Sequence, residues 1–356
     1  MHSVCAAPTP ASFMSDSAAP LAFVTGGTGF VGSHLAEELI RRGYRVRALV
    51  RSDPKWLDGL DVETVPGGLH DADALRRGMD GADLVVHVAG MTRARTQRPL
   101  DHANVDGTRA VLEAVRDTGV PRVLVTSSLE AMGPNRLRHD GTPVPATEAD
   151  PLRPISMYGI SKAHMEDEVR RDFADLGVTV VRPPAVYGPR EADLYEMVKG
   201  AARGLFPIVG DAHQPRVSMV YVADLVRGMA DLAEAPEAAG ETFFVGTPGF
   251  SWAEVRAAVE AAVGRKTLTL PIPERVIGAV GATIGLAGGL VICVLLEKVG
   301  FPLDPDVYYI STLPIDINIE EIVSVVVCAV LISILATIYP SIQAARLKPV
   351  DGLRDD

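Results

Sequence analysis

Short apolar runs alternate with helix-like patterns along the first 270 residues of the chain. Runs rich in Val, Leu and Ala predict strands, which we place at Leu21–Thr25, Arg45–Val50, Leu84–Val88, Val123–Thr126 and Val178–Val181. Segments with helical periodicity lie between them, such as Ser33 to Arg42, which ends at Gly43. Strands that alternate with helices are typical of a parallel sheet covered on both faces. The pattern therefore predicts an α/β fold with a doubly wound parallel sheet.

The pattern changes near residue 272, where long apolar runs replace the alternation. Residues 276–296 form 21 positions without a charge, and residues 322–339 form 18 more. Each run is long enough to cross about 30 Å of hydrocarbon as a helix. The second run is rich in Val and Ile and could form a buried strand, but its length and its lack of turn residues favour a membrane helix. We predict a two-helix transmembrane hairpin.

Charges around the two runs predict the orientation of this hairpin. The 25 residues between the runs, 297–321, carry six acidic side chains and one lysine, whereas basic residues flank both outer ends. Because basic flanks stay on the cytoplasmic side, the loop should lie outside and both ends inside. The domain that precedes the hairpin is therefore expected in the cytoplasm.

Composition supports a junction between two segments. Residues 1–271 hold 4 isoleucines and residues 272–356 hold 13, while 25 of the 28 arginines precede position 272. A membrane segment alone also enriches isoleucine and excludes arginine, so the shift supports a fusion without proving one. We predict a disordered tail at 1–20, a folded domain at 21–275 and the membrane hairpin at 276–356.

Charge and cysteine content exclude several classes of protein. The 34 basic and 45 acidic residues give a net charge of −11, which disfavours a nucleic-acid partner. The three cysteines lie at 5, 293 and 328, so no disulfide framework exists and a reducing compartment fits. Residues 1–20 lack the apolar core of a secretory signal. We expect the inner (cytoplasmic) membrane as the location, or the cytoplasm if 276–356 does not belong to the natural chain.

Four glycines follow the first predicted strand, in the run TGGTGFVG at 25–32, and three of them have a specific use. Gly26 suits a tight turn, Gly29 lets the backbone approach a pyrophosphate, and Gly32 permits close packing of the following helix. A plain glycine turn is the alternative interpretation. The strand before the run and the helix after it favour a dinucleotide site of Rossmann type.

A tyrosine and a lysine stand four residues apart in the run YGISK at 158–162. On a helix, Tyr158 and Lys162 share one face, and an ammonium beside a phenol should lower the pKa of the phenol toward the working pH. Such a phenol can exchange a proton with a substrate hydroxyl. Ser127 and Ser128 follow the strand at 123–126 and could hold the same substrate oxygen.

This ordered set resembles the extended short-chain dehydrogenase/reductase family, the NAD(P)-dependent epimerase/dehydratase group, over about residues 21–275. The runs that carry the resemblance are TGGTGFVG at 25–32, DLVVHVAG at 83–90, NVDGT at 104–108, VTSSLEAMG at 125–133, YGISK at 158–162, RPPAVYGPR at 182–190 and VYVADL at 220–225. The resemblance implies a small substrate lobe and hydride transfer at a carbinol or carbonyl carbon. It also implies that Ser128, Tyr158 and Lys162 are the catalytic residues.

The resemblance further implies which residues contact the cofactor. The expected contacts are Gly26, Gly29, Phe30, Val31, Gly32, Arg51, Ala89, Gly90, Tyr158, Lys162 and Pro183. Asn104 would support the active-site helix. A homodimer is compatible with this family.

Departures from the family pattern change the expected chemistry. The acidic residue that binds the ribose of NAD, about 20 positions after the glycines, is absent, and Arg51 stands there instead. An arginine can pair with a 2′-phosphate, so we predict NADP, with NAD as the alternative. Gly68 replaces the acid of the family near the adenine. Leu129 replaces the first acid of the Asp-Glu pair of sugar dehydratases, which disfavours dehydration.

The substrate is expected to be a small molecule, either a nucleotide sugar or a related ketone or alcohol. Arginines that could face a diphosphate are Arg93, Arg95, Arg98 and Arg216, although exposed arginines are more often solvated. The histidines at 70, 87, 102 and 213 show no metal-ligand spacing, so no metal is expected.

Residues 285–356 resemble the C-terminus of lipoprotein-releasing ABC transporter permeases, on the runs DVYYISTLP at 306–314 and YPSIQAARLKPVDGLR at 339–354. The enzyme family would continue past Pro271 to finish its substrate lobe, so the resemblance implies a truncated lobe and impaired activity. Two alternatives remain: a permease fragment that carries a passenger domain, and a non-catalytic NADP sensor. The intact Tyr158 and Lys162 argue against the sensor.

Overall fold

The computed structural model describes residues 19–272, except for 137, 139–142, 207, 210–215, 248 and 269–270. The chain divides into two compact units, residues 1–199 with 216–255 and residues 200–215 with 256–356. Most of the predicted N-terminal tail and the whole hairpin predicted at 276–356 lie outside the described residues. Within 19–272, as far as it is described, no helix has both the length and the apolar composition needed to cross a membrane.

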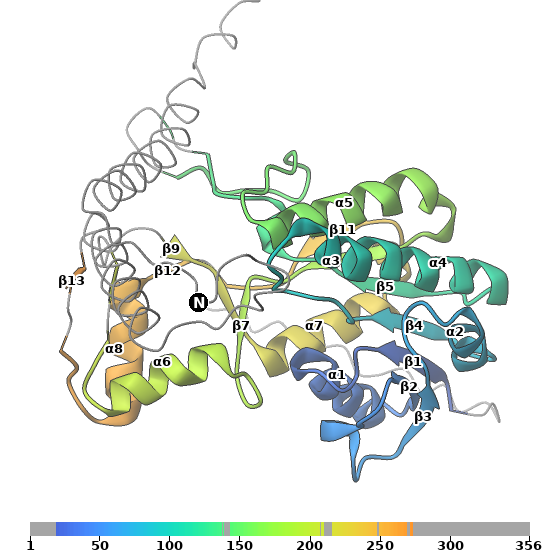
Figure 1. The fold of residues 1–356 in the computed structure, drawn as a ribbon, viewed down its shortest axis with the longest axis horizontal. Coiled ribbons are helices and arrows are strands. Elements are labelled where there is room, and N and C mark those ends of the chain that lie inside the picture. Colours follow the sequence, from blue (N-terminus) through green and yellow to red (C-terminus); the bar gives the residue numbers. More distant parts are fainter. Residues whose placement is uncertain are drawn as a thin grey trace, which may run out of the picture. The chain divides into compact units, whose positions relative to one another are not determined.

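Seven parallel strands form the main sheet of the larger unit (Figure 1). Their spatial order is β11-β6-β5-β4-β1-β2-β3. The strands are β1 (Leu21–Thr25), β2 (Arg45–Val50), β3 (Val62–Pro66), β4 (Leu84–His87), β5 (Val123–Thr126), β6 (Thr179–Arg182) and β11 (Thr242–Phe244). The chain runs outward from β1 to β3 and then returns to β4 on the other side of β1. In doubly wound folds, ligands bind at the carboxyl ends of the strands where the order reverses, which here are β1 and β4.

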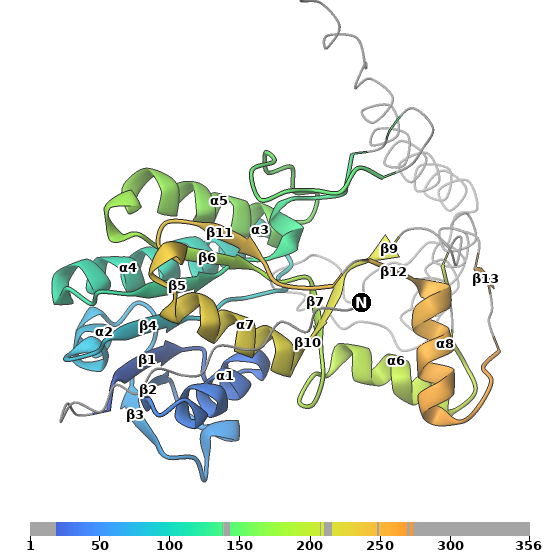
Figure 2. The ribbon, with the colours of Figure 1, turned by 180° about the vertical axis from the view of Figure 1, so that it is seen from behind.

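Helices cover both faces of this sheet, as Figures 1 and 2 show. The covering helices are α1 (Phe30–Arg41), α2 (Ala72–Met79), α4 (Gly107–Thr118), α5 (Met157–Asp172) and α7 (Val222–Glu234), and the other helices of the described residues are α3 (Gln97–Asp101), α6 (Asp193–Ala202) and α8 (Trp252–Val263). Phe23 of β1 packs with residues of α2, α4 and α5, whereas its neighbour Val24 packs with residues of α1 and α7. Successive strand residues point to opposite faces, so this alternation builds two apolar cores. The predicted doubly wound parallel sheet is confirmed.

The predicted element boundaries hold for the central strands and fail at the edges of the sheet. β1, β2 and β5 have the expected ends, β4 ends at His87 rather than Val88, and β6 lies one residue later than expected. The two edge strands, β3 and β11, were not predicted because edge strands need no continuous apolar run. Helix α1 begins at Phe30 rather than Ser33, because the end of the glycine run already forms its first turn.

Shorter elements follow β6 in the chain. β7 (Ala185–Tyr187) pairs in parallel with β10 (Met219–Tyr221), and β9 (Arg216–Val217) pairs antiparallel with β12 (Phe250–Ser251). In the smaller unit, β8 (Ile208–Val209) pairs with β13 (Pro271–Ile272). Single turns of 3₁₀ helix are η1 (Lys55–Leu57), η3 (Leu129–Ala131), η4 (Ala174–Leu176) and η5 (Pro236–Ala238), and a π-helical turn, η2, spans His102–Asp106.

Candidate active site

The glycine run after β1 forms a tight cradle before helix α1. Gly26 has a φ of +76°, and a Cβ there would lie 2.5 Å from the amide nitrogen of Ala89. The Gly29 amide donates to the Gly26 carbonyl over 3.0 Å, and a Cβ at Gly32 would overlap that same carbonyl. Only glycine fits at positions 26 and 32, and this lets the backbone turn sharply and lets helix α1 start close to the sheet.

The N-terminus of α1 is left open to an anion. Gly29 caps the helix without a side-chain hydrogen bond, and the first turn holds no acidic residue. The amides of Phe30, Val31 and Gly32 belong to the turn that has no intrahelical acceptors, and the helix dipole adds partial positive charge there. These residues therefore fit the pyrophosphate of a dinucleotide.

The carboxyl end of β2 carries Arg51, at the position expected for the ribose-binding residue. Its guanidinium is exposed and has no hydrogen bond or ion pair to the described residues. The aliphatic part of Arg51 lies beside Gly68, where a Cβ would be 3.8 Å away. Because Gly68 has no side chain, position 68 supplies no carboxylate to neutralise the Arg51 guanidinium at this end of the sheet.

The carboxyl end of β4 leads into a backbone segment fixed by Asn104. The Asn104 amide donates to the carbonyl of Met91 and to Ser161 Oγ, each over 2.8 Å, and Oδ1 accepts from the Met91 amide over 2.8 Å. Asn104 is fully buried in the π-helical turn η2. A Cβ at Gly90 would lie 3.5 Å from Lys162 Nζ. Asn104 thus ties the segment at 89–91 to helix α5, as expected.

The predicted catalytic residues meet at the carboxyl end of β5. Ser128 caps the turn η3 at the end of β5, and Tyr158 lies near the start of α5, whose first turn contacts η3. Lys162, one turn further along α5, is buried and donates to the Thr126 carbonyl over 2.8 Å. Pro183 lies beside this group, since its carbonyl accepts from the Leu129 amide over 2.9 Å. The structure therefore brings together the residues that the spacing predicted.

The protonation of this group differs from the expectation. Burial raises the pKa of Tyr158 to about 12, the hydrogen bond with Ser128 opposes this increase, and the Glu130 carboxylate adds to it. Burial lowers the pKa of Lys162 to about 8, against the opposing charge of Glu166. The prediction that Lys162 lowers the pKa of Tyr158 is wrong for this structure, because burial dominates at both groups. Tyr158 is a neutral phenol at pH 7 and can act as a proton donor.

A buried ion pair behind the site was missed by the sequence reasoning. Arg182, at the end of β6, donates to Glu166 over 2.6 Å, and both side chains are 2% exposed. Ser127 Oγ donates to the same carboxylate over 2.5 Å. Glu166 follows Lys162 by four residues, and that spacing was the available signal. The pair links α5 to β5 and β6, so it holds the helix that carries Tyr158 against the sheet.

The start of α5 is fixed by a second acidic residue. Ser156 caps the helix by accepting from the Gly159 amide over 2.9 Å, and its hydroxyl donates to Glu130 over 2.5 Å. A side chain at Gly159 would overlap the Glu130 carbonyl. Glu130 therefore positions the helix turn that presents Tyr158, in addition to its charge effect on that phenol.

The histidines have structural positions. His87 is buried between Thr25 Oγ1, 2.6 Å away, and Thr108 Oγ1, 2.9 Å away, and burial lowers its pKa to about 3. His70 and His102 stack with ring centroids 4.1 Å apart. Throughout the described part of the chain no group of three or more His, Cys, Asp or Glu could hold a metal ion. His213 lies outside that part.

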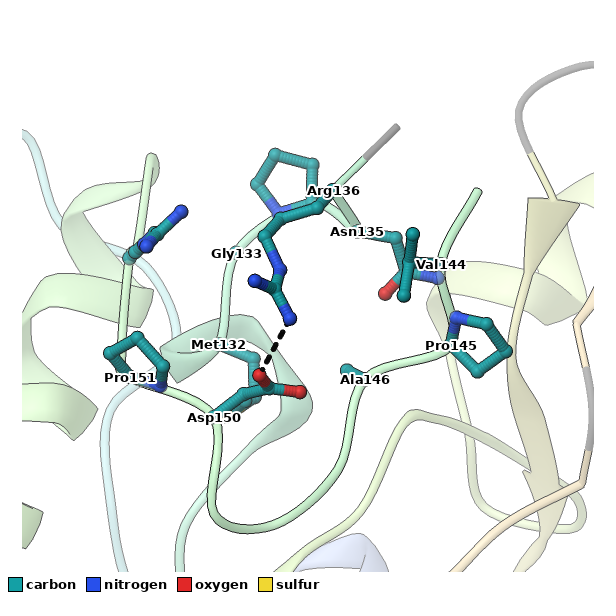
Figure 3. Close-up of a pocket in the computed structure, with 11 residues that line it drawn as sticks. Met132, Gly133, Asn135, Arg136, Val144, Pro145, Ala146, Asp150 and Pro151 are labelled. Carbon is teal, nitrogen blue, oxygen red and sulfur yellow. Dashed lines mark hydrogen bonds and ion pairs between the residues drawn. The ribbon is translucent and has the colours of Figure 1, made fainter. Parts of the chain in front are cut away.

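Figure 3 shows a pocket in the segment that follows η3. Its walls include Met132, Gly133 and the ion pair in which Arg136 donates to Asp150 over 3.0 Å. Ser128, Tyr158 and Lys162 do not line it. The pocket is therefore separate from the catalytic group.

Comparisons with known proteins identify relatives of the folded domain. Residues 22–246 match the sequence model of the NAD dependent epimerase/dehydratase family. Ceramide reductase of Caulobacter vibrioides is 34% identical over 276 residues, which cover 76% of this chain and 79% of that protein. UDP-glucose 4-epimerase of Vibrio cholerae is 27% identical over 263 residues, covering 70% and 78% of the two chains.

A solved structure supports the same fold with ligands present. The structure of MoeE5 in complex with UDP-glucose and NAD is 28% identical, has a TM-score of 0.60, and covers 71% of this chain and 85% of that one. The comparisons support the epimerase/dehydratase domain, and the predicted fusion to a permease segment stays a prediction. The chain, matched over more than half of its length, belongs to the NAD dependent epimerase/dehydratase family.

Proposed function

We propose that this chain reduces a ketone, or oxidises the matching secondary alcohol, with an NAD(P) cofactor. The observation that carries the proposal is the placement of Ser128 at the end of β5 next to the helix turn of α5 that carries Tyr158 and the buried Lys162, whose ammonium donates to the Thr126 carbonyl over 2.8 Å. A bound dinucleotide supplies the hydride in the reducing direction. Ser128 orients the substrate oxygen, and Tyr158 gives its phenolic proton to that oxygen. Hydride on carbon and proton on oxygen together convert C=O into CH–OH.

The cofactor is proposed to be NADP rather than NAD. Arg51 is exposed at the end of β2, where an acidic residue would repel a 2′-phosphate, and its guanidinium has no partner among the described residues. Guanidinium groups bind phosphates in a bidentate manner. The family name and the MoeE5 complex refer to NAD, so the preference for NADP is a property proposed for this chain.

The cofactor preference is tested by thermal unfolding of the full chain. NADPH should raise the melting temperature more than NADH does, and Arg51→Asp should reverse the order. Arg45→Asp is a matched control, because Arg45 is an exposed arginine at the opposite end of the same strand. Equal shifts with both cofactors, or the same change in both variants, would contradict the role of Arg51.

Apolar side chains beside the catalytic tyrosine support a lipophilic substrate. Ile155 is 80% exposed, Met157 is 43% exposed and Met91 is 37% exposed. Met157 directly precedes Tyr158, and the backbone of Met91 is the segment held by Asn104. These side chains lie on the chain segments that lead into the catalytic group, where exposed apolar surface favours an apolar ligand. The similarity to a ceramide reductase supports the same class, a ketone on a long apolar chain.

A nucleotide sugar is the second candidate. The similarity to a UDP-glucose 4-epimerase and to a protein solved with UDP-glucose supports it. Arg95 and Arg98, which follow β4, are exposed and have no partner among the described residues. Both could face a diphosphate.

Membrane attachment through residues 276–339, with the enzyme domain in the cytoplasm, is a further part of the proposal. A homodimer is another part of it.

The substrate class is tested by initial rates with the full chain in mixed micelles. A long-chain 3-oxo lipid should be reduced with NADPH, and Met157→Gln should raise its KM more than it lowers kcat. Arg98→Gln serves as the control, because it should change only activity toward a diphosphate sugar. Conversion of UDP-glucose without reduction of the lipid would overturn the lipophilic assignment and support the second candidate.

A further inference from the structure

Arg190 has a strained backbone in the loop that follows β7. Its φ is +73°, and the one other non-glycine residue with a positive φ in the described part of the chain is Lys55. Residues other than glycine rarely adopt this conformation, and where they do the surrounding structure enforces it. Trp56, next to Lys55, lies under the Arg190 guanidinium at 5.1 Å from the ring centroid. The strained residue Arg190 therefore contacts the residue that follows the other strained position, Lys55.

The guanidinium of Arg190 is fixed on the first turns of α1. One terminal nitrogen donates to Ser33 Oγ over 2.9 Å, and the other donates to Glu37 over 2.5 Å. The Arg190 side chain is 20% exposed. Ser33 is fully buried and its hydroxyl donates to the Phe30 carbonyl over 3.0 Å. Ser33 and Glu37 are four residues apart, so Arg190 lies along one face of the helix.

This face belongs to the helix whose open N-terminus fits a pyrophosphate. Ser33 is the fourth residue of α1, directly after Phe30, Val31 and Gly32. A guanidinium has five N–H donors in a fixed planar fork, and the hydrogen bonds described above use two of them. Donors remain for an anion. The helix terminus supplies a partial positive charge, and the Arg190 guanidinium, which is paired with Glu37, adds further N–H donors beside it.

We propose that Arg190 is a cofactor-binding residue that presents its guanidinium to the pyrophosphate of the dinucleotide. Ser33, Glu37 and Trp56 hold it in place, and the strained backbone at 190 is the conformation that lets the loop reach α1. The proposal rests on the dinucleotide site described above and not on the identity of the substrate. Arg51 and Arg190 then bind different phosphates of the same cofactor.

Two ligand fragments separate these roles. ADP-ribose carries the pyrophosphate without a 2′-phosphate, and adenosine 2′-monophosphate carries the 2′-phosphate without a pyrophosphate. Isothermal titration of the full chain should show that Arg190→Met weakens ADP-ribose and NADPH by about tenfold. The same variant should bind adenosine 2′-monophosphate as the wild type does. Arg51→Met, the matched control, should show the opposite selectivity.

Arg190→Lys keeps the positive charge but lacks the fork, so it should recover only part of the affinity for ADP-ribose. It also keeps the test decisive if Arg190→Met fails to fold. Wild-type affinity for ADP-ribose in either variant would overturn the proposal. An equal loss for both fragments would overturn it too, because that result means a general change of structure. If the wild-type chain binds both fragments but reduces no ketone, the proposed function is wrong, whereas the proposed role of Arg190 in cofactor binding still stands.

Discussion

The ionisation of Tyr158 distinguishes the structure from the expectation based on spacing alone. With a pKa of about 12, about one Tyr158 side chain in 10⁵ is a phenolate at pH 7, and about 1% are phenolates at pH 10. An ordinary tyrosine, with a pKa of 10, is half ionised at pH 10. If Lys162 dominated instead, Tyr158 would ionise below pH 9. The two interpretations therefore differ by several decades in the phenolate fraction.

The difference can be measured without a substrate. The chain has 8 tyrosines, so a difference spectrum of tyrosinate absorbance between the wild type and Tyr158→Phe isolates the titration of one of them. We expect no difference between the two proteins up to about pH 10, and Lys162→Met should not change this result. One equivalent of tyrosinate that appears below pH 9 in the wild type, and disappears in either variant, would refute the reasoning. Circular dichroism at each pH is the control for unfolding.

Other predictions concern stability and the C-terminal segment. His87 has a pKa near 3 in the folded state and 6.5 when unfolded, so its contribution is full above pH 6.5 and is lost as the pH falls toward 3. The free energy of unfolding, measured in urea, should drop by about 3 kcal/mol between pH 7 and pH 4, and His87→Gln should reduce this dependence. Arg182→Met should cost about 3–5 kcal/mol of stability by leaving Glu166 buried and unpaired, and Arg182→Met/Glu166→Leu should recover most of it. The full chain should pellet with membranes and resist carbonate extraction, whereas a chain without residues 276–356 should not; a soluble full chain would contradict the hairpin.

The parts of the site that could be predicted are those encoded in short spacings. The glycine run places Gly26, Gly29 and Gly32 within seven consecutive residues. Helix α5 places Tyr158 and Lys162 about one helical turn apart. Local geometry brings such residues together in almost any context, so their spacing predicts their arrangement. The central strands were equally predictable, because strands buried on both faces need continuous apolar runs.

The parts that could not be predicted depend on contacts between distant segments. Arg190 contacts Ser33, which lies 157 positions earlier in the sequence. Its positive φ could not be predicted either, because arginine is not a residue type that indicates this backbone conformation. Arg182 and Glu166 stand on different elements, so only the packing of α5 against the sheet makes them a pair. Such contacts follow from topology, which local periodicity does not contain.

The sign of the pKa shift at Tyr158 shows why spacing does not determine chemistry. A lysine four residues from a tyrosine can lower the pKa of the phenol only where its charge is not outweighed by burial. Here Lys162 donates to the Thr126 carbonyl, and Glu130 adds a negative charge near the phenol. Burial is the larger cause of the raised pKa, and the Glu130 charge adds to it, so Tyr158 keeps its proton. Tyr158 therefore starts as the protonated phenol, which is the form that can donate a proton to a substrate oxygen, and the shift follows from the environment of the phenol rather than from its spacing to Lys162.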